Sequence, residues 1–180
     1  MNQRELTPVD RLLVEVDGML KTLSRKGASA MRPSPAAGHR DSKLSDKERK
    51  HSAGLMRVNH TGEVCAQALY QGQAMTAKSV GTRSEMQEAA QEEIDHLVWC
   101  EERLEELGTR PSVLNPLFYG ASLAMGAVAG LVGDSVSLGF VHATEERVAS
   151  HLRSHLKTLP ETDRKSQLIL QTMLEDEERH

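Results

Sequence analysis

Two short motifs in the sequence have the residue types and the spacing of metal ligands. Both are Glu-x-x-His: the first pairs Glu93 with His96, and the second pairs Glu177 with His180. Positions i and i+3 of a helix lie on one face, so each pair can direct a carboxylate and an imidazole at the same metal ion. Glutamate-rich helices contain such pairs by chance, so the motif alone is weak evidence.

Stronger evidence comes from the helical face that each pair occupies. Glu93 and His96 interrupt a stripe of apolar residues at helical spacing. This stripe consists of Met86, Ala89, Ala90, Leu97, Cys100, Leu104 and Leu107. Glu177 and His180 extend a second apolar face, which carries Leu170, Met173 and Leu174. A solvated charge would not lie on an inward face, so both pairs are candidate buried ligands.

Two single glutamates, Glu63 and Glu145, have the same placement. Glu63 shares a predicted face with Met56, Asn59, Ala66 and Tyr70. Glu145 lies on a stripe formed by Leu138, Val141, Val148, Ala149, Leu152 and Leu156. The helical wheels assign Asp95 and Asp176, which adjoin the motifs, to other faces. Four carboxylates therefore lie on inward faces, where each would cost roughly several kcal/mol without a partner.

The positions of the turns test this arrangement independently. If two antiparallel helices hold their ligands at one level, the turn must lie midway between the ligands. Glu63 and Glu93 have 29 residues between them and their midpoint at residue 78, where small and polar residues predict a turn. The second pair of glutamates has 31 residues between them and its midpoint at residue 161, within Pro160-Glu161-Thr162. The spacing therefore predicts two helical hairpins, each carrying Glu…Glu-x-x-His.

One Glu from each of two helices and one Glu-x-x-His from each of two others is the ligand set of ferritin-like di-iron and di-manganese proteins. The predicted metal ligands are Glu63, Glu93, His96, Glu145, Glu177 and His180. Two divalent ions balance four carboxylates, and Glu93 and Glu177 are the natural bridges because each lies beside a histidine. Oxygen ligands with one imidazole per metal favour iron or manganese over zinc. The alternative is an acidic bundle with incidental Glu-x-x-His pairs.

The elements that position these residues are all predicted to be helices. Capping-box patterns begin at Ser45 and Ser84, and Asp134 is a candidate N-cap. The predicted helices are 7–24, 46–78, 84–107, 135–159 and 163–180, with the uncharged stretch 111–133 joining the hairpins. We expect an all-α fold: a ferritin-like four-helix bundle of two helical hairpins with a long apolar crossover helix.

Composition divides the chain into two parts. Residues 1–44 are expected to form an N-terminal amphipathic helix and a flexible linker, because 25–44 is rich in Ala, Pro and Ser. Residues 45–180 are expected to form the di-iron helical bundle domain. The last helical pattern reaches His180 without a C-cap, so we expect the natural chain to continue.

Charge and cysteine usage exclude several classes of protein. The net charge of −4 and the absence of a dense basic patch argue against a nucleic-acid partner. Five aromatic residues in 180 argue against a β-rich fold. Cys65 and Cys100 have no paired spacing, which indicates a reducing compartment. The first apolar stretch is broken by charges and is not a secretory signal, so we expect an intracellular protein.

Four ordered motifs resemble the demethoxyubiquinone hydroxylase family. They are Asn59-His60-Thr61-Gly62-Glu63, the segment Glu92–Trp99, the segment Thr144–His151, and Glu175–His180. The resemblance spans about 45–180 and implies an O2-dependent di-iron monooxygenase. Such an enzyme hydroxylates the ring of a polyprenylated demethoxyubiquinol intermediate in ubiquinone biosynthesis. Its two Fe2+ ions would be held by the six ligands named above, which match the family's ligands residue by residue.

The resemblance also implies partners and a location. It implies NADH as the reductant, although the sequence has no GxGxxG motif to hold it. It implies peripheral membrane association, on the cytoplasmic face of the inner membrane if the protein is bacterial, and membership of a ubiquinone-biosynthesis complex. The apolar run 117–132 is short and glycine-rich for a membrane span, and two roles stay open for it: lying on a membrane surface, or packing inside the bundle.

Several alternatives stay open at the level of sequence. His151 is either a hydrogen-bond partner of a ligand carboxylate or a surface residue, and Tyr70 is more readily explained as a core residue than as a donor to the site. The main alternative function is a ferritin-like or rubrerythrin-like protein that oxidises iron or scavenges peroxide. Hydroxylation of a non-lipid substrate such as a tRNA base, and a structural bundle at a membrane, are the others.

Overall fold

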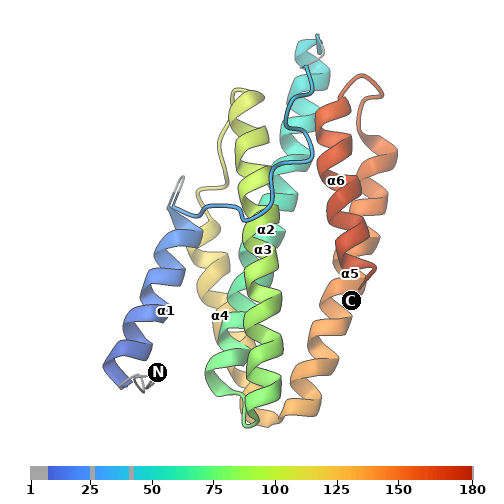
Figure 1. The fold of residues 1–180 in the computed structure, drawn as a ribbon. Coiled ribbons are helices and arrows are strands. Elements are labelled where there is room, and N and C mark those ends of the chain that lie inside the picture. Colours follow the sequence, from blue (N-terminus) through green and yellow to red (C-terminus); the bar gives the residue numbers. More distant parts are fainter. Residues whose placement is uncertain (1–7, 25–26, 41–42, 180) are drawn as a thin grey trace.

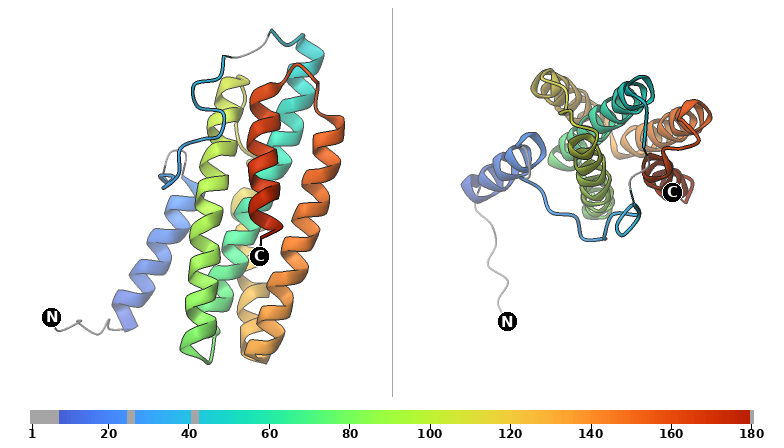
Figure 2. Two further views of the ribbon diagram at one scale, coloured as in Figure 1. Left: turned by 45° about the vertical axis from the view of Figure 1, so that its right-hand side comes forward. Right: turned by 90° about the horizontal axis from the view of Figure 1, so that it is seen from above.

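The computed structural model describes residues 8–24, 27–40 and 43–179, which form six helices and no strand (Figure 1). The helices are α1 (Pro8–Leu23), α2 (Asp46–Thr76), α3 (Val80–Glu106), α4 (Asn115–Val132), α5 (Asp134–Thr158) and α6 (Arg164–Glu177). The expected all-α bundle is confirmed. Viewed from above in Figure 2, α1 lies at the outside of the bundle that the later helices form.

The two predicted hairpins are α2–α3 and α5–α6. The first turn is formed by 77–79 and the second by 159–163, so each contains the midpoint of its pair of glutamates. Ser45 closes the predicted capping box of α2: its backbone N–H donates to the Glu48 carboxylate over 2.8 Å, and its Oγ accepts from the backbone N–H of Glu48. The lengths of these helices set Glu63 and Glu93 at one level.

The beginning of α3 differs from the prediction by about one turn. The N-cap is Ser79, whose Oγ accepts a 3.0 Å hydrogen bond from the backbone N–H of Thr82. Ser84, the predicted start, lies inside the helix and donates to Glu88 instead. Asp134 is not an N-cap either: it is the first residue of α5, and its carboxylate accepts from the backbone N–H groups of Lys78 and Ser79, each over 2.9 Å. This contact joins the first turn to the start of α5.

Close backbone contact attaches the crossover helix α4 to α2. A Cβ added to Gly72 or Gly126 would overlap a backbone carbonyl oxygen of the opposite helix, so only glycine allows this separation. Among the described residues, α4 alone is long and apolar enough to cross a membrane, by length and composition only, and one third of it is buried. The outward face carries Leu117, Phe118, Met125, Val128, Leu131 and Val132.

Residues 28–36, here called the strap, cross the outside of α3 on the way from α1 to α2 (Figure 1). The backbone N–H of Met31 donates to Asp95 over 2.6 Å, and the Trp99 indole N–H donates to the Arg32 carbonyl over 3.2 Å. Ala36 is buried in the largest apolar cluster of the bundle. Composition predicted a flexible linker here, whereas this described part of it is attached to the bundle by specific contacts. The domain boundary at residue 45 stays a prediction.

Candidate metal centre

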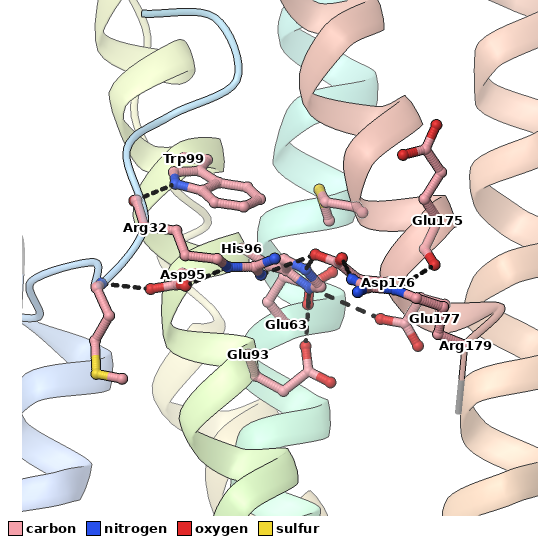
Figure 3. A network of polar contacts seen from close by, with 12 residues as sticks. Arg32, Glu63, Glu93, Asp95, His96, Trp99, Glu175, Asp176, Glu177 and Arg179 are labelled. Carbon is pink, nitrogen blue, oxygen red and sulfur yellow. Dashed lines mark hydrogen bonds and ion pairs between the residues drawn. The ribbon is translucent and has the colours of Figure 1, made fainter.

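Four of the six predicted ligands come together inside the bundle. They are Glu63 from α2, Glu93 and His96 from α3, and Glu177 from α6, and one ligand atom from each lies within 4.8 Å of the others (Figure 3). All four side chains are buried. The α2–α3 hairpin and the distant helix α6 therefore direct three carboxylates and one imidazole at the same small volume, a donor set that fits a hard divalent cation.

Polar atoms without hydrogen-bond partners support the presence of a metal at this place. Glu63 Oε2, Glu93 Oε2 and His96 Nδ1 are buried and make no hydrogen bond in the structure. The His96 Nδ1 lies 3.5 Å from Glu63 Oε2 and 3.4 Å from Glu93 Oε2, which is too far for good hydrogen bonds. Buried polar atoms of native proteins are nearly always satisfied, so three that face one another fit the ligand atoms of a bound cation.

The orientation of His96 is set by Asp176. The Nε2 of His96 lies 2.9 Å from Asp176 Oδ2, and this carboxylate accepts a hydrogen bond from the ring N–H. A proton on Nε2 leaves the Nδ1 lone pair directed at the three glutamates, which is the tautomer that a metal ligand needs. The helix face only brings the imidazole to the site, whereas the hydrogen bond to Asp176 fixes its orientation and its tautomer.

The carboxyl groups of the cluster have raised pKa values because they are buried close to one another. Burial and the neighbouring Glu63 charge raise the pKa of Glu93 to about 8. Burial and the Glu93 charge raise the pKa of Glu177 to about 9. Carboxyl groups with such pKa values are protonated at neutral pH unless a cation replaces the protons, because like charges this close disfavour the ionised form.

The remaining two predicted ligands have different outcomes. Glu145 is buried on α5, but it is not one of the four clustered residues. Its charge contributes to the raised pKa values of Glu177 and Tyr70. His180 lies outside the described residues. The roles of Glu145 and His180 as ligands stay predictions.

Sequence reasoning missed three residues around this cluster. Asp95 and Asp176 were assigned to other faces, yet both are buried, and Arg32 was placed in a linker. Arg32 pairs with both carboxylates (Figure 3). The available signal was position: an aspartate precedes His96 directly, and another precedes Glu177. Acidic residues beside a ligand are frequent partners of the ligand histidines.

A cavity of about 400 Å³ lies between α2, α4 and α5. The buried Glu63 lines it, and Met125, which is half exposed on α4, lines it as well. Its other walls include Val58, Ala66, Leu69, Phe140 and Val148. The volume and the apolar lining are those of a small-molecule site. Because Glu63 belongs to both, the cavity adjoins the metal cluster.

The other residues with chemically useful side chains, His151, Tyr70 and the two cysteines, lie in different environments. His151 is exposed, lines the cavity and packs its ring at 4.5 Å from that of His155. Tyr70 is buried in an apolar cluster, and burial together with the glutamate charges raises the pKa of its hydroxyl far above the usual range. Cys65 and Cys100 are free thiols, the second fully buried.

Comparisons with known proteins show which family the chain is similar to. A sequence model of one family, described as "Ubiquinone biosynthesis protein COQ7", matches residues 50–180. A protein of Ectopseudomonas mendocina (strain ymp) named 3-demethoxyubiquinol 3-hydroxylase is 59% identical over 179 residues, which cover 99% of this chain and 83% of the relative. A protein of Pseudomonas aeruginosa (strain LESB58) with the same name is 58% identical over 177 residues, covering 98% and 82%.

Proposed function

Because the chain belongs to the COQ7 family of ubiquinone biosynthesis proteins, we propose that it is an O2-dependent monooxygenase that hydroxylates the ring of a polyprenylated demethoxyubiquinol. The observation that carries this proposal is the joint position of Glu63, which is both a member of the metal cluster and a wall of the apolar cavity. A ring held in that cavity would lie next to the metals. The relatives' names supply the substrate class, and the cavity is apolar enough for it.

We assign two iron ions to the centre. Glu63, Glu93 and His96 would hold the first ion. Glu145, Glu177 and His180 would hold the second. The clustered donor set supports the first ion directly, and the buried Glu145 beside Glu177 supports the second. Carboxylate and imidazole ligands favour iron or manganese, and the family's chemistry with O2 selects iron.

Each part of the chain has a distinct task in this reaction. When bound, the irons supply the redox chemistry by which one oxygen atom of O2 enters a ring C–H bond and the other leaves as water. The four helices hold the carboxylates in place and exclude bulk water from them. Asp176 keeps the proton of His96 on Nε2 throughout, so that Nδ1 stays a ligand. The cavity orients the ring at Glu63.

The exposed side of α4 is the proposed point of access for a lipid substrate. Leu117, Val128 and Leu131 are each at least 60% exposed there, and Met125 joins this face to the cavity. An apolar helix face of this kind inserts shallowly at a membrane surface. We therefore place the protein peripherally on the inner membrane, on the cytoplasmic face if it is bacterial, where the polyprenyl tail can stay in the lipid while the ring enters the cavity.

Reduction of the second oxygen atom to water needs two electrons and two protons. We propose NADH as their source, as the family resemblance implies, and membership of a ubiquinone-biosynthesis complex as the setting. The described residues contain no nucleotide-binding Gly-rich loop between a strand and a helix, so NADH would act at another surface or through a reductase.

The test is anaerobic loading of the purified chain with Fe2+, followed by ¹⁸O2 and a demethoxyubiquinol in detergent. We expect two irons per chain and a product heavier by one ¹⁸O atom. Glu93→Gln should lower the iron content and abolish the product, whereas Glu92→Gln, at the exposed adjacent position, should change neither. A chain that stores many irons and gives no hydroxylated quinol would instead be a ferritin-like or rubrerythrin-like protein.

A further inference from the structure

The strap contacts the metal centre through one side chain. Arg32 extends from the strap between α3 and α6 and pairs with a carboxylate on each (Figure 3). Its Nε lies 2.8 Å from Asp95 Oδ2, and its Nη2 lies 2.8 Å from Asp176 Oδ2. The guanidinium also stacks on Trp99, 4.9 Å from the ring centroid. These contacts fix the position of the Arg32 side chain, although 41% of it is exposed.

The oxygen that Arg32 binds on Asp176 is the one that His96 uses. Asp176 Oδ2 accepts from Arg32 Nη2 at 2.8 Å and from His96 Nε2 at 2.9 Å. The other oxygen, Oδ1, pairs with Arg179 at the end of α6, whose side chain is mostly exposed. Only Arg32 therefore acts on the oxygen that holds the histidine proton, among the residues that the structure describes.

The strap itself is held so that Arg32 cannot turn away. The Met31 backbone N–H donates to Asp95 Oδ1, and the Trp99 indole donates to the Arg32 carbonyl, so the backbone on both sides of the Arg32 Cα is bound to α3. Asp95 receives two strap donors on its two oxygens. A residue whose backbone, side-chain plane and charge are all bound in this way is preorganised for its contact with Asp176.

We propose that Arg32 is a positioning residue of the metal centre, which acts through Asp176 to hold His96 as a ligand by its Nδ1. The strap is then part of the enzyme's metal site, even though it lies outside the four-helix bundle. This inference rests on the proposed metal centre. Partners of this kind typically change metal affinity about 10- to 100-fold when they are removed.

The experiment compares four full-length chains: wild type, Arg32→Gln, Arg32→Lys and Arg153→Gln. Arg153 is the matched control because it pairs at an exposed position with Glu178, the residue that caps the C-terminus of α6 next to Glu177. Each chain is stripped of metal and titrated with Co2+ against a competing chelator, and the visible ligand-field spectrum of bound Co2+ is recorded. Hydrogen exchange of residues 28–36 reports separately on attachment of the strap.

We expect Arg32→Gln to weaken binding of one Co2+ by about 10- to 100-fold and to change the Co2+ spectrum. Arg32→Lys should give an intermediate loss, because one ammonium cannot reach both carboxylates with fixed geometry. Arg153→Gln should match the wild type. Should Arg32→Gln fail to fold, the Arg32→Lys result decides the question alone.

Two results would overturn the inference and can be told apart. If the strap of Arg32→Gln exchanges faster while Co2+ affinity and spectrum equal those of the wild type, Arg32 only attaches the strap, and the metal centre stands. If the wild type itself binds no Co2+, the proposed metal centre fails and the inference fails with it.

Discussion

The Cα of Gly126 in α4 faces the carbonyl oxygen of Leu69 in α2, with no room for a side chain between them. Gly72 makes the reciprocal contact with Leu123 of α4. The crossover helix is therefore attached by backbone contact to the helix that carries Glu63. This contact fixes the position of Met125, and with it the outer part of the cavity, relative to the metal cluster.

Gly126→Ala tests this contact. The added methyl group would meet backbone rather than a flexible side chain, so α4 must move away, and we expect a loss of about 1–3 kcal/mol in the free energy of unfolding. The control is Gly120→Ala in the same helix, where an added Cβ meets nothing within 4 Å. That change should stabilise the protein by about 0.5–1 kcal/mol through helix propensity. Urea unfolding of both variants measures the contrast, and equal effects would contradict the close packing.

Ala143→Phe tests the cavity as the substrate site. Ala143 lines the cavity from α5, and a phenyl ring there would occupy space that the quinol needs. We expect the KM for the demethoxyubiquinol to rise about tenfold, since lost or blocked apolar contacts of this size are worth about 1–3 kcal/mol. Iron content should not change. Ser150→Phe, exposed on the same helix and outside the cavity lining, is the control, and an equal rise in KM there would argue against the cavity.

Arg103→Leu tests a buried ion pair outside the metal cluster. The fully buried Arg103 side chain donates to Asp163 Oδ1 over 2.8 Å and to Ser166 Oγ over 3.0 Å, joining α3 to the N-terminus of α6. Removing the cation leaves the Asp163 carboxylate buried without its partner, so we expect a loss of about 3–5 kcal/mol in urea unfolding. Asp163→Asn added to this variant should recover much of the loss, since asparagine still caps α6. No recovery would mean that packing, and not charge, is the cause.

His60→Gln tests the stability of the protein in acid. Burial lowers the pKa of His60 to about 4 in the folded chain, whereas the unfolded chain takes up this proton near pH 6.5. Stability is thus highest above pH 6.5 and falls as the pH drops towards 4, by about 1–2 kcal/mol at pH 5 from this residue. Glutamine cannot take up the proton, so unfolding of metal-free His60→Gln should lose that much less between pH 7 and pH 5. His142→Gln, at an exposed position, should behave like the wild type.

The hairpins and the inward faces of Glu63, Glu93 and His96 could be predicted because they depend on local patterns. Helical periodicity and turn residues are encoded within about ten residues of each position. The start of α3 was harder to predict, because Ser79 and Ser84 both fit an N-cap. Which serine caps α3 depends on Asp134, because its carboxylate accepts from the backbone N–H of Ser79. Asp134 lies 55 positions after Ser79 in the sequence.

The strap and its contacts with the two aspartates could not be predicted for a related reason. A helical wheel shows which face of one helix is apolar, but not which distant segment covers the other faces. Residues 28–36 have no periodicity, and Arg32 meets Asp95 and Asp176, which are 63 and 144 positions away in the sequence. A single sequence contains no signal for such a pairing.

The central position of each turn has a consequence for how the length of this chain can change. Residues added at 77–79 or at 159–163 lie beyond the ends of the helices, so they lengthen a connection without displacing any ligand. One residue added between Glu63 and Thr76, in contrast, would rotate every position on one side of it by about 100° and raise it by about 1.5 Å. We therefore expect the metal centre to tolerate insertions in the turns at the ends of the bundle and not within its helices. The metal centre thus determines the number of residues between each ligand and its turn.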